Sequence, residues 1–509
     1  MIRSIRNLAR LVGLARLLSQ YDALFALEQV GAPHALIWLA KRLWGRTLQG
    51  RPGERLAQAL QKAGPSFIKL GQALSTRSDL LGEEIAADLS SLQDRLPPFS
   101  GAAARKAITA EFGQPVEDLF ESFNEESMAA ASIAQVHFAR TKDGQDVAVK
   151  ILRPDIEIAF ARDIDLFQWL AELAEEANTD LKRLRPLETV RTIAETVTLE
   201  MDLRYEAAAA AELAENFEGD ETFHVPAVDW KRTGRRILTT EWVNGIPLND
   251  RTAIVAAGHD PLAILAIAAN SFFLQVFRDG FFHGDLHPGN LFVRKDSALV
   301  AVDFGIMGRI NRQDRRHLAA LLLAFMTGNY RRAAEVHFDA GWIPSTRSID
   351  AFTQACRSIG EPILDKPQNE ISIARLLAQL FQVSKSFQME AQPQLLLLQK
   401  TMLVAEGSGR LLAPEANIWL LARPLIEKWG ADNLSPEAHL HETAQDIFQT
   451  LQKLPIFIDN VGKITQSIAG GGVRLHPDTI QAMRAGQRTQ WGRRISLVML
   501  AIAALFLLS

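Results

Sequence analysis

The chain has a single cysteine, Cys356, among its 509 residues. One thiol excludes a disulfide framework and any metal or iron–sulfur site that needs several cysteines. It also favours a reducing compartment, either the cytosol or a membrane surface that faces it. An excess of positive charge is missing as well, because the formal net charge is −4. Without a basic field, nucleic acid is not expected as a partner.

Three further absences narrow the chemistry. No Gly-x-Gly-x-x-Gly follows a predicted strand, which argues against a flavin, and no cluster of histidine and glutamate suggests an iron centre. The beginning of the chain is too charged for a secretory signal. The composition, 48% apolar and 22% charged, is typical of a globular protein, and the length allows two or more domains.

What is present points to phosphoryl transfer. Residues 282–293 read Phe-His-Gly-Asp-Leu-His-Pro-Gly-Asn-Leu-Phe-Val, and an Asp-Phe-Gly turn follows at 303–305. We expect Asp285 to orient the attacking hydroxyl or accept its proton, and Asn290 and Asp303 to bind magnesium on the nucleotide phosphates. Short strands are expected at 291–293 and 299–302. The alternative is a surface turn rich in aspartate, asparagine and glycine.

A second signal lies upstream, where Lys150 closes the strand 147–150. A kinase-like fold needs a lysine at the end of such a strand to reach the α- and β-phosphates. The preceding loop is rich in small residues, which let the backbone approach a ligand, although alanine cannot adopt the positive φ angles of glycine. The predicted nucleotide-binding residues of this loop are Ala129, Ala130, Ala131, Ser132, Ile133, Ala134, Gln135 and Val136.

Residues 69–72, Lys-Leu-Gly-Gln, resemble the KxGQ signature of the UbiB/ADCK/COQ8 atypical kinases. The alanine-rich loop, the Glu-Met-Asp of residues 200–202 (the family's ExD motif) and the loop 283–290 follow in family order. The resemblance covers residues 55–415. It implies a UbiB-like protein that supports ubiquinone (coenzyme Q) biosynthesis at a membrane, with ATP or ADP and Mg²⁺ as cofactors.

The resemblance also assigns roles to charged residues. It implies that Glu206 pairs with Lys150 and that Lys69 is a second catalytic residue beside Asp285. Glu200 and Asp202 would face Lys69, and these two carboxylates with Gln72 would be regulatory. Backbone groups near Glu241 and Val243, where a kinase fold hinges between its lobes, would bind the adenine edge. For each charged residue the alternative is a solvated helix face.

We therefore predict an α+β chain with a bilobal protein-kinase-like fold, in which a small β-rich lobe precedes a large helical lobe. A helical N-terminal KxGQ extension and a C-terminal helical and membrane tail flank the lobes. The predicted units are basic amphipathic membrane-surface helices (1–50), the extension (51–99), the small lobe with inserted helices (100–248), the large lobe (249–430), a helical region (431–494) and a short apolar anchor (495–509).

Two ends of the chain bear on location. The first helix has an apolar stripe beside an arginine face, so it either lies on an anionic membrane or docks on its own domain. The apolar run 495–509 is about 22 Å long as a helix against about 30 Å of hydrocarbon, so we expect a short anchor rather than an interface helix. The apolar segment 261–280 is expected to be a buried helix. We expect the bacterial inner (plasma) membrane, with the catalytic domain on the cytosolic side, or the mitochondrial inner membrane in a eukaryote.

Two departures from ordinary kinases qualify the activity. The residue before Asp285 is Gly284 rather than arginine, and no Ala-Pro-Glu follows Gly308. Both argue against phosphorylation of folded proteins and for an ATPase or a small-molecule kinase. The expected partners are nucleotide, membrane lipids, polyprenylated quinone precursors and other ubiquinone-biosynthesis proteins, and a homodimer is left open.

Three alternative functions stay open beside this enzyme. The first is a nucleotide-gated, non-catalytic scaffold or lipid chaperone for quinone precursors. The second is a ring monooxygenase (2-polyprenylphenol 6-hydroxylase), against which the missing flavin and iron motifs argue. The third is a phosphotransferase like the aminoglycoside and choline kinases, which lack the KxGQ extension.

Overall fold

The computed structural model describes residues 2–29, 34–46, 48–75, 82–89, 96–177 and 186–362, together with parts of 383–430. The chain divides into two compact units, 1–431 and 432–509, and all described residues belong to the first. The predicted helical region 431–494 and the anchor 495–509 lie outside the described residues.

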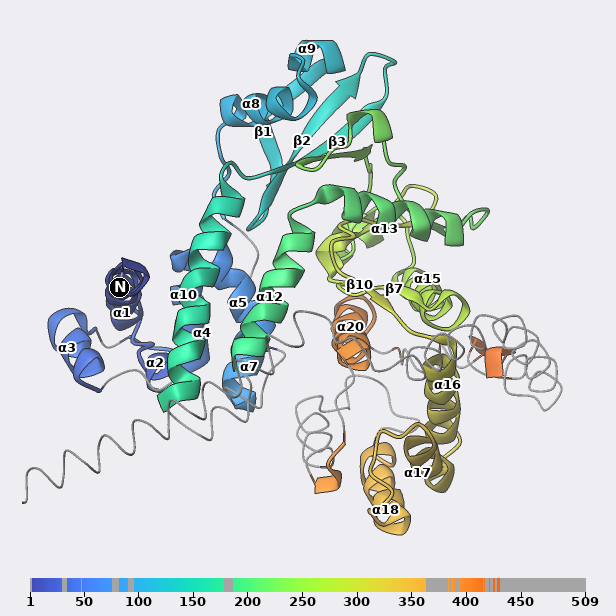
Figure 1. The fold of residues 1–509 in the computed structure, drawn as a ribbon. Helices are drawn as coiled ribbons and strands as arrows, with labels where there is room; N and C mark the ends of the chain where they lie inside the picture. The colour runs from blue at the N-terminus through green and yellow to red at the C-terminus, as the bar shows by residue number, and fades with distance from the viewer. Residues whose placement is uncertain are drawn as a thin grey trace, which may run out of the picture. The chain divides into compact units, whose positions relative to one another are not determined.

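The small lobe is built on an antiparallel sheet of order β1-β2-β3-β5 (Figure 1). Its strands are β1 (Phe120–Ala130), β2 (Ala134–Thr141), β3 (Asp146–Leu152) and β5 (Ile237–Glu241). Gly144, with a φ of 79°, makes the tight turn between β2 and β3. Helices α8 (Gly101–Phe112) and α9 (Val116–Leu119) pack on the sheet through Ile108 and Phe120.

The strand β1 was not predicted, because its sequence is acidic and does not alternate. Glu121, Glu125 and Glu126 are exposed, and the register with β2 shifts three times. β1 therefore forms because it pairs with β2, and not because its own residues favour a strand.

Helices follow β3 where ordinary kinases have none, as predicted. They are α10 (Ile156–Ala177), α12 (Pro186–Glu200) and α13 (Leu203–Asn216). In Figure 1, α10 and α12 run side by side away from the small lobe, and α13 lies below its sheet. The inserted pair thus connects the small lobe to the N-terminal helices.

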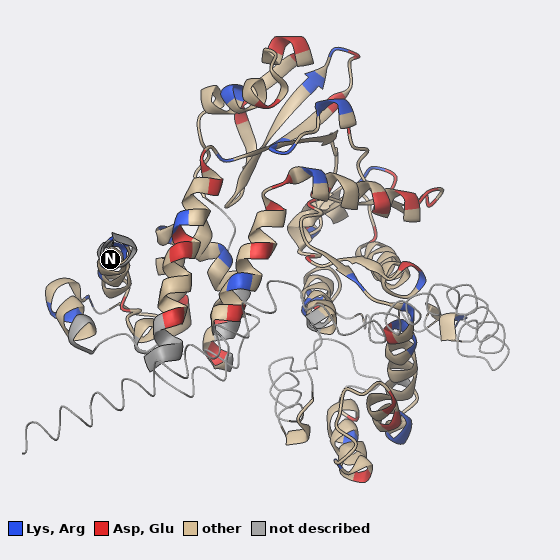
Figure 2. Cartoon of the chain, in the orientation of Figure 1, with Lys and Arg blue, Asp and Glu red and all other residues tan. Residues whose placement is uncertain are grey.

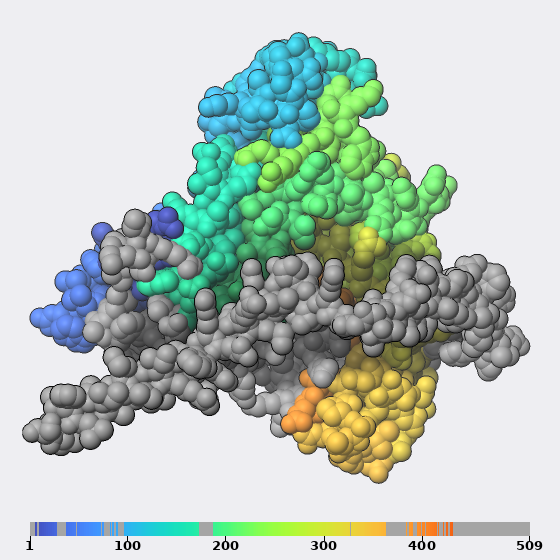
Figure 3. Space-filling model, in the orientation of Figure 1, coloured from blue at the N-terminus to red at the C-terminus, as the bar shows by residue number. Residues whose placement is uncertain are grey.

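The N-terminal helices form one layer with that pair. They are α1 (Ile2–Gln20), α2 (Phe25–Gln29), α3 (His34–Trp44), α4 (Pro52–Ala63), α5 (Pro65–Ser75) and α7 (Glu83–Leu89). Leu11 and Ile37 share one hydrophobic core with Leu60, Ile68 and Leu166, so the predicted division at residue 50 is not a boundary between cores. Figure 3 shows the N-terminal helices in blue against the blue-green surface of α10.

The arginine face of α1 has partners within the protein. Arg6 Nη2 donates to Asp165 Oδ2 at 2.8 Å, and Arg10 Nη1 donates to the carbonyl of Arg162 at 2.6 Å. Both partners lie on α10. Of the two interpretations of the first helix, docking on its own domain is the one that these contacts support.

The large lobe places short strands around the predicted catalytic loop. A sheet of order β4-β9-β8-β6 lies beside the pair β7–β10. These elements are β4 (Phe223–His224), β6 (Ile246–Pro247), β7 (Phe281–His283), β8 (Leu291–Val293), β9 (Leu299–Ala301) and β10 (Met307–Arg309). β4 begins at the buried Phe223, which pairs in parallel with Leu299 of β9.

The apolar segment 261–280 is a core element of this lobe. It forms α15 (Pro261–Phe273) and the π-helix η2 (Leu274–Asp279), which follow α14 (Arg251–Ala256). Among the described residues, Pro261–Asp279 is the one helix long and apolar enough to cross a membrane. Its side chains Leu265, Phe272 and Phe277 nevertheless lie in the hydrophobic core, in agreement with the predicted buried helix.

Four longer helices complete the described part of the lobe. They are α16 (Arg312–Met326), α17 (Tyr330–Asp339), α18 (Ile349–Gly360) and α20 (Pro393–Leu412). Tyr330, Phe352 and Cys356 form a separate core between α17 and α18. Leu398 and Leu412 of α20 pack instead into the main core, behind the catalytic loop.

Candidate nucleotide-binding site

Lys150 joins the two lobes. Its Nζ donates to Glu206 Oε1 at 2.7 Å and to Asp303 Oδ1 at 2.8 Å. The lysine comes from β3 of the small lobe, Glu206 from the first turn of α13, and Asp303 from the segment after β9. The predicted partnership with Glu206 is confirmed, although more than fifty residues separate the two in sequence.

The three charges shift one another's pKa values. Burial alone would lower the pKa of Lys150, but the neighbouring Asp303 and Glu206 outweigh it and raise the pKa. The Lys150 ammonium holds the pKa of Asp303 below its usual range. Burial raises the pKa of Glu206, which Lys150 only partly offsets. Lys150 is thus kept charged between the carboxylates, ready for an anionic ligand.

The catalytic loop is held rigidly by its own backbone. Asn290 Nδ2 donates to the carbonyl of Asp285 at 3.0 Å, and the Asp285 amide donates to His283 Nδ1 at 3.1 Å. The other ring nitrogen of His283 must then donate to the Val302 carbonyl, 3.2 Å away. Burial lowers the pKa of His283, so the ring is neutral. These contacts leave the Asp285 carboxylate at the surface of the loop.

Asn290 and Asp303 lie at neighbouring strand ends. The Val302 amide donates to the Asn290 carbonyl at 2.9 Å, so the residue after Val302 sits beside Asn290. Asp303 has a φ of 65°, a left-handed conformation that non-glycine residues rarely adopt and that accumulates at functional sites. Magnesium in nucleotide sites needs only one or two protein oxygens beside the phosphates, so this pair fits the ion.

The alanine-rich loop forms the turn of the β1–β2 hairpin, with Ala129 opposite Val136 and Ala130 opposite Gln135. Gln135 is buried, and its amide exchanges two hydrogen bonds with the backbone of Phe99, at 2.9 and 3.1 Å. The side chain of Gln135 therefore anchors the segment at Phe99, and the approach of this loop's backbone to a nucleotide stays a prediction. Ser132 is buried as well, at the tip of the turn.

Arg153 fastens the same loop to the same linker. Its guanidinium donates to the carbonyls of Ala131 at 2.7 Å, Pro97 at 3.0 Å and Leu96 at 3.3 Å. Its amide also donates to the Ile133 carbonyl at 2.8 Å. Nothing in the local sequence around Arg153 indicates a side chain that bridges two loops.

Lys69 of α5 reaches the ExD motif. Its Nζ lies 2.9 Å from Glu200 Oε2 at the end of α12, in the geometry of an ion pair rather than an aligned hydrogen bond. Asp202 turns the other way, because it caps α13 and binds Arg204 through both carboxylate oxygens, at 2.9 and 2.6 Å. The expectation that Asp202 acts beside Glu200 on Lys69 is corrected in this respect.

The extension also lies close enough to Asp303, a predicted metal ligand, to influence its charge. The charge of Lys69 contributes to the low pKa of Asp303. Gln72 follows one turn later on α5, where its carbonyl accepts from Ser75 Oγ at 2.7 Å.

The hinge is only partly available for adenine. The Glu241 amide donates to the Ala227 carbonyl at 2.9 Å, and its carboxylate binds His224 Nε2 at the same distance. The Trp242 amide donates to the Asp146 carbonyl. The amide and the carboxylate of Glu241 are therefore engaged within the protein, and adenine binding by the other backbone groups near Glu241 and Val243 stays a prediction.

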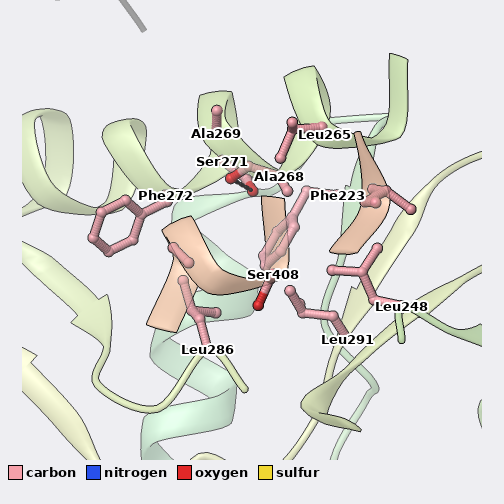
Figure 4. A pocket seen from close by; sticks show the side chains of 12 residues that line it. Phe223, Leu248, Leu265, Ala268, Ala269, Ser271, Phe272, Leu286, Leu291 and Ser408 are labelled. Carbon is pink, nitrogen blue, oxygen red and sulfur yellow. Dashed lines mark hydrogen bonds between the residues drawn. The ribbon is translucent and has the colours of Figure 1, made fainter. Parts of the chain in front are cut away.

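A cavity of about 30 Å³ lies behind the catalytic loop (Figure 4). Leu286 and Leu291 line it from the loop side, and α15 and α20 supply most of the remaining wall, including Ser271 and Ser408. It has room for one or two water molecules and is far too small for a nucleotide. It is a packing defect of the large lobe and not the binding site.

Two residues of α20 that contact the catalytic loop were not predicted from the sequence. Lys400 Nζ lies 3.7 Å from Asp285 Oδ1, and Thr401 Oγ1 donates to the Gly284 carbonyl at 3.0 Å. Both follow the catalytic loop by more than a hundred residues, inside a leucine-rich helix with no motif of its own. Only the packing of α20 on the loop reveals them.

Comparison with known proteins agrees with this geometry. Residues 91–337 match the ABC1 atypical kinase-like domain, and residues 356–417 match the UbiB helical domain. The chain is 40% identical over 483 residues to the "Probable protein kinase UbiB" of Pseudomonas aeruginosa. The aligned region covers 94% of this chain and 89% of the relative. It is 42% identical over 429 residues to the protein of the same name from Aeromonas hydrophila. That aligned region covers 83% of this chain and 78% of the relative.

A solved structure is similar too. The complex of Rv3197 with erythromycin, from Mycobacterium tuberculosis, superposes with a TM-score of 0.52 at 26% identity, over 73% of this chain and 95% of that one. The kinase-like arrangement of the two lobes and the predicted family are thus both confirmed. The chain belongs to the UbiB family of ABC1 atypical kinase-like proteins.

Proposed function

We propose that the protein binds Mg-ATP between its lobes and hydrolyses or transfers the γ-phosphate. The observation that carries this proposal is Lys150 held between Glu206 and Asp303, at 2.7 and 2.8 Å. A lysine in a structural ion pair needs only one carboxylate. A charged lysine between two carboxylates can bind a phosphate while the carboxylates keep it in position. The loop with Asp285 and Asn290 lies beside it.

The protein residues divide the work of the reaction. Lys150 would bind the α- and β-phosphates, and Asn290 and Asp303 would hold magnesium, which would neutralise charge on the phosphates. Asp285 accepts the proton of the attacking hydroxyl. Its backbone is fixed by His283 and Asn290, so its carboxylate is positioned before the substrate arrives.

The N-terminal extension restrains this site. Lys69 pairs with Glu200 and places a positive charge near Asp303. The linker from the extension is tied to the alanine-rich loop through Arg153 and Gln135. A large protein substrate would have to displace these elements, so we propose ATP hydrolysis or transfer to a small acceptor.

The biological role we propose is support of ubiquinone biosynthesis at a membrane, as the family resemblance implies. The curated relatives are named probable protein kinases UbiB. The acceptor would be water or a phenolic quinone precursor, and other proteins of the pathway would be partners. We place the protein at the inner membrane, with the site on the cytosolic side.

Helix α3 supports the membrane location. Trp38, Leu39 and Leu43 are 62%, 48% and 56% exposed, and the guanidinium of Arg42 lies over the Trp38 ring at 5.6 Å. At helical spacing these residues share one face. Figure 2 shows blue but no red on α3. An apolar face with tryptophan and basic residues suits the interface of an anionic bilayer.

Vesicle flotation of the full chain tests this surface. Trp38→Ser with Leu43→Ser should weaken binding to anionic vesicles at least about tenfold, because each side chain contributes about 1–2 kcal/mol when buried. Val255→Ser, an exposed residue of α14, is the control. Undiminished binding of the double variant would remove α3 from the interface.

A non-catalytic lipid chaperone is the second candidate. The structure of Rv3197 holds erythromycin, a bulky and largely apolar ligand. A related fold can therefore hold such molecules, and quinone precursors are also bulky and apolar. On this view nucleotide would set the shape of the protein rather than be consumed.

Nucleotide turnover separates the two candidates. The purified chain would be assayed with and without membranes and a phenolic quinone precursor, and compared with Asp303→Asn and Lys69→Ala. We expect Asp303→Asn to abolish turnover, because it removes the metal-binding carboxylate. Equal and negligible turnover in all three proteins would refute the enzyme and leave the chaperone.

A further inference from the structure

Helix α20 packs directly on the catalytic loop. The buried Thr401 hydroxyl donates to the Gly284 carbonyl at 3.0 Å. A Cβ atom on Gly284 would lie 3.1 Å from Leu397 Cδ1 and 3.0 Å from Ile306 Cγ2. These contacts are tighter than ordinary ones, so with an added Cβ the side chain of Leu397 or the segment of Ile306 would have to shift by a few tenths of an ångström. The glycine that stands where ordinary kinases have arginine thus lets α20 pack closely on the loop.

The approach of α20 brings a cation to the catalytic aspartate. Lys400 Nζ lies 3.7 Å from Asp285 Oδ1, and the two side chains are 40% and 36% exposed. This separation is longer than a hydrogen bond, so the ammonium is not committed to the carboxylate. Its flexible four-carbon stem lets it bind a second anionic group while it stays beside Asp285.

We propose that Lys400 is a catalytic residue whose ammonium binds the transferring phosphoryl group on the acceptor side. The proposal rests on the proposed function. In the step, the acceptor oxygen bonds to the γ-phosphorus and gives its proton to Asp285. The bond from the γ-phosphorus to the bridging oxygen breaks, and its electron pair stays on the β-phosphate of ADP.

Charge spreads over the γ-phosphoryl oxygens during this step. Lys150 contacts the nucleotide side, so the acceptor side needs its own cation, and Lys400 is placed to supply it. The loop belongs to the matched range 91–337 and Lys400 to the range 356–417. The helical domain thus completes the catalytic centre of the kinase-like domain.

Steady-state kinetics of the full chain test this role. Lys400→Met should lower kcat for Mg-ATP about 10- to 100-fold, since a donor that acts in the transition state has effects of this order or larger. KM for Mg-ATP and Kd for ADP should stay within about twofold, because the ground-state nucleotide contacts are intact. Lys400→Arg should recover much of kcat. Lys106→Met, an exposed lysine on α8, controls for the loss of one helical surface charge.

The outcomes separate this role from the proposed function. Turnover in the wild type with an unchanged Lys400→Met overturns the role of Lys400 alone. A variant that loses kcat and ADP affinity together, or whose thermal midpoint falls, also overturns it, because the lysine would then support packing or nucleotide binding. Wild-type turnover no higher than that of Asp303→Asn overturns the proposed function and this role with it.

Discussion

The ion pair between Lys69 and Glu200 allows a quantitative test of how the extension is held. The two side chains are 12% and 11% exposed, and their charged atoms are 2.9 Å apart. At an effective dielectric constant of about 20, their attraction is about 6 kcal/mol before desolvation is subtracted. Removing one partner leaves the other charge nearly buried and without this contact, which costs about 2–4 kcal/mol at this exposure.

A double-mutant cycle measures that coupling. Lys69→Met and Glu200→Gln should each lower the free energy of unfolding by about 2–4 kcal/mol, whereas the double variant should lose only about 1–2 kcal/mol because no charge is orphaned. The extension should stay folded, since Phe67 packs edge-on against Phe167 at 5.0 Å and Ile68 is fully buried. Urea unfolding followed by circular dichroism gives the four values.

The exposed pair Arg140–Asp146, also in close contact at 2.7 Å, is the matched control. Its side chains are 48% and 37% exposed, so solvent should reduce its coupling to less than about 1 kcal/mol. If the Lys69–Glu200 cycle gives no larger coupling energy than this control, the two side chains are solvated and their ion pair does not hold the extension.

Three further changes have defined outcomes. Arg153→Ala should raise Kd for ADP about tenfold in a fluorescence titration, and Arg153→Lys should not restore it, because a single ammonium cannot reach the carbonyls of both loops; an unchanged Kd would show that the loop holds its shape without the guanidinium. Lys150→Met should make the thermal midpoint rise more with added Mg²⁺ than in the wild type, since Glu206 and Asp303 then repel each other without a cation; equal shifts would contradict this. Burial lowers the pKa of His337, so below pH about 6.5 the unfolded chain takes up a proton that the folded chain does not. Stability should fall as the pH drops through this window, and His337→Phe, beside Trp342 and Phe352, should reduce the slope by up to about 1.4 kcal/mol per pH unit; an unchanged slope in pH-dependent unfolding would count against a neutral ring.

Local motifs were sufficient to predict the catalytic loop and the lysine strand. Asp285 follows the short strand β7, Asn290 directly precedes β8 and Asp303 follows β9, while Lys150 lies within β3, a strand of alternating burial. The partner Glu206 was found despite the inserted helices, because the resemblance supplied a position that spacing alone could not.

Other residues were beyond sequence reasoning for a physical reason. Gln135 looks like part of a phosphate loop, but its amide satisfies the backbone of Phe99, which arrives from another segment. Glu241 lies where a kinase fold has its hinge, yet its amide donates to the carbonyl of Ala227, which belongs to another segment. Lys400 has no signal at all until α20 packs on the loop. Each of these contacts is made between segments that are distant in sequence.

The joint between α12 and α13 gives the ExD motif a mechanical meaning. Glu200 ends one helix and Asp202 caps the next, so the contact to Lys69 and the contact from Glu206 to Lys150 are carried by consecutive helices. A displacement of the extension would turn α13 about this short hinge and draw Glu206 from its lysine. Binding at the surface of the extension would then be coupled to the position of Lys150 through the two residues between α12 and α13. This coupling would not require a phosphorylated loop.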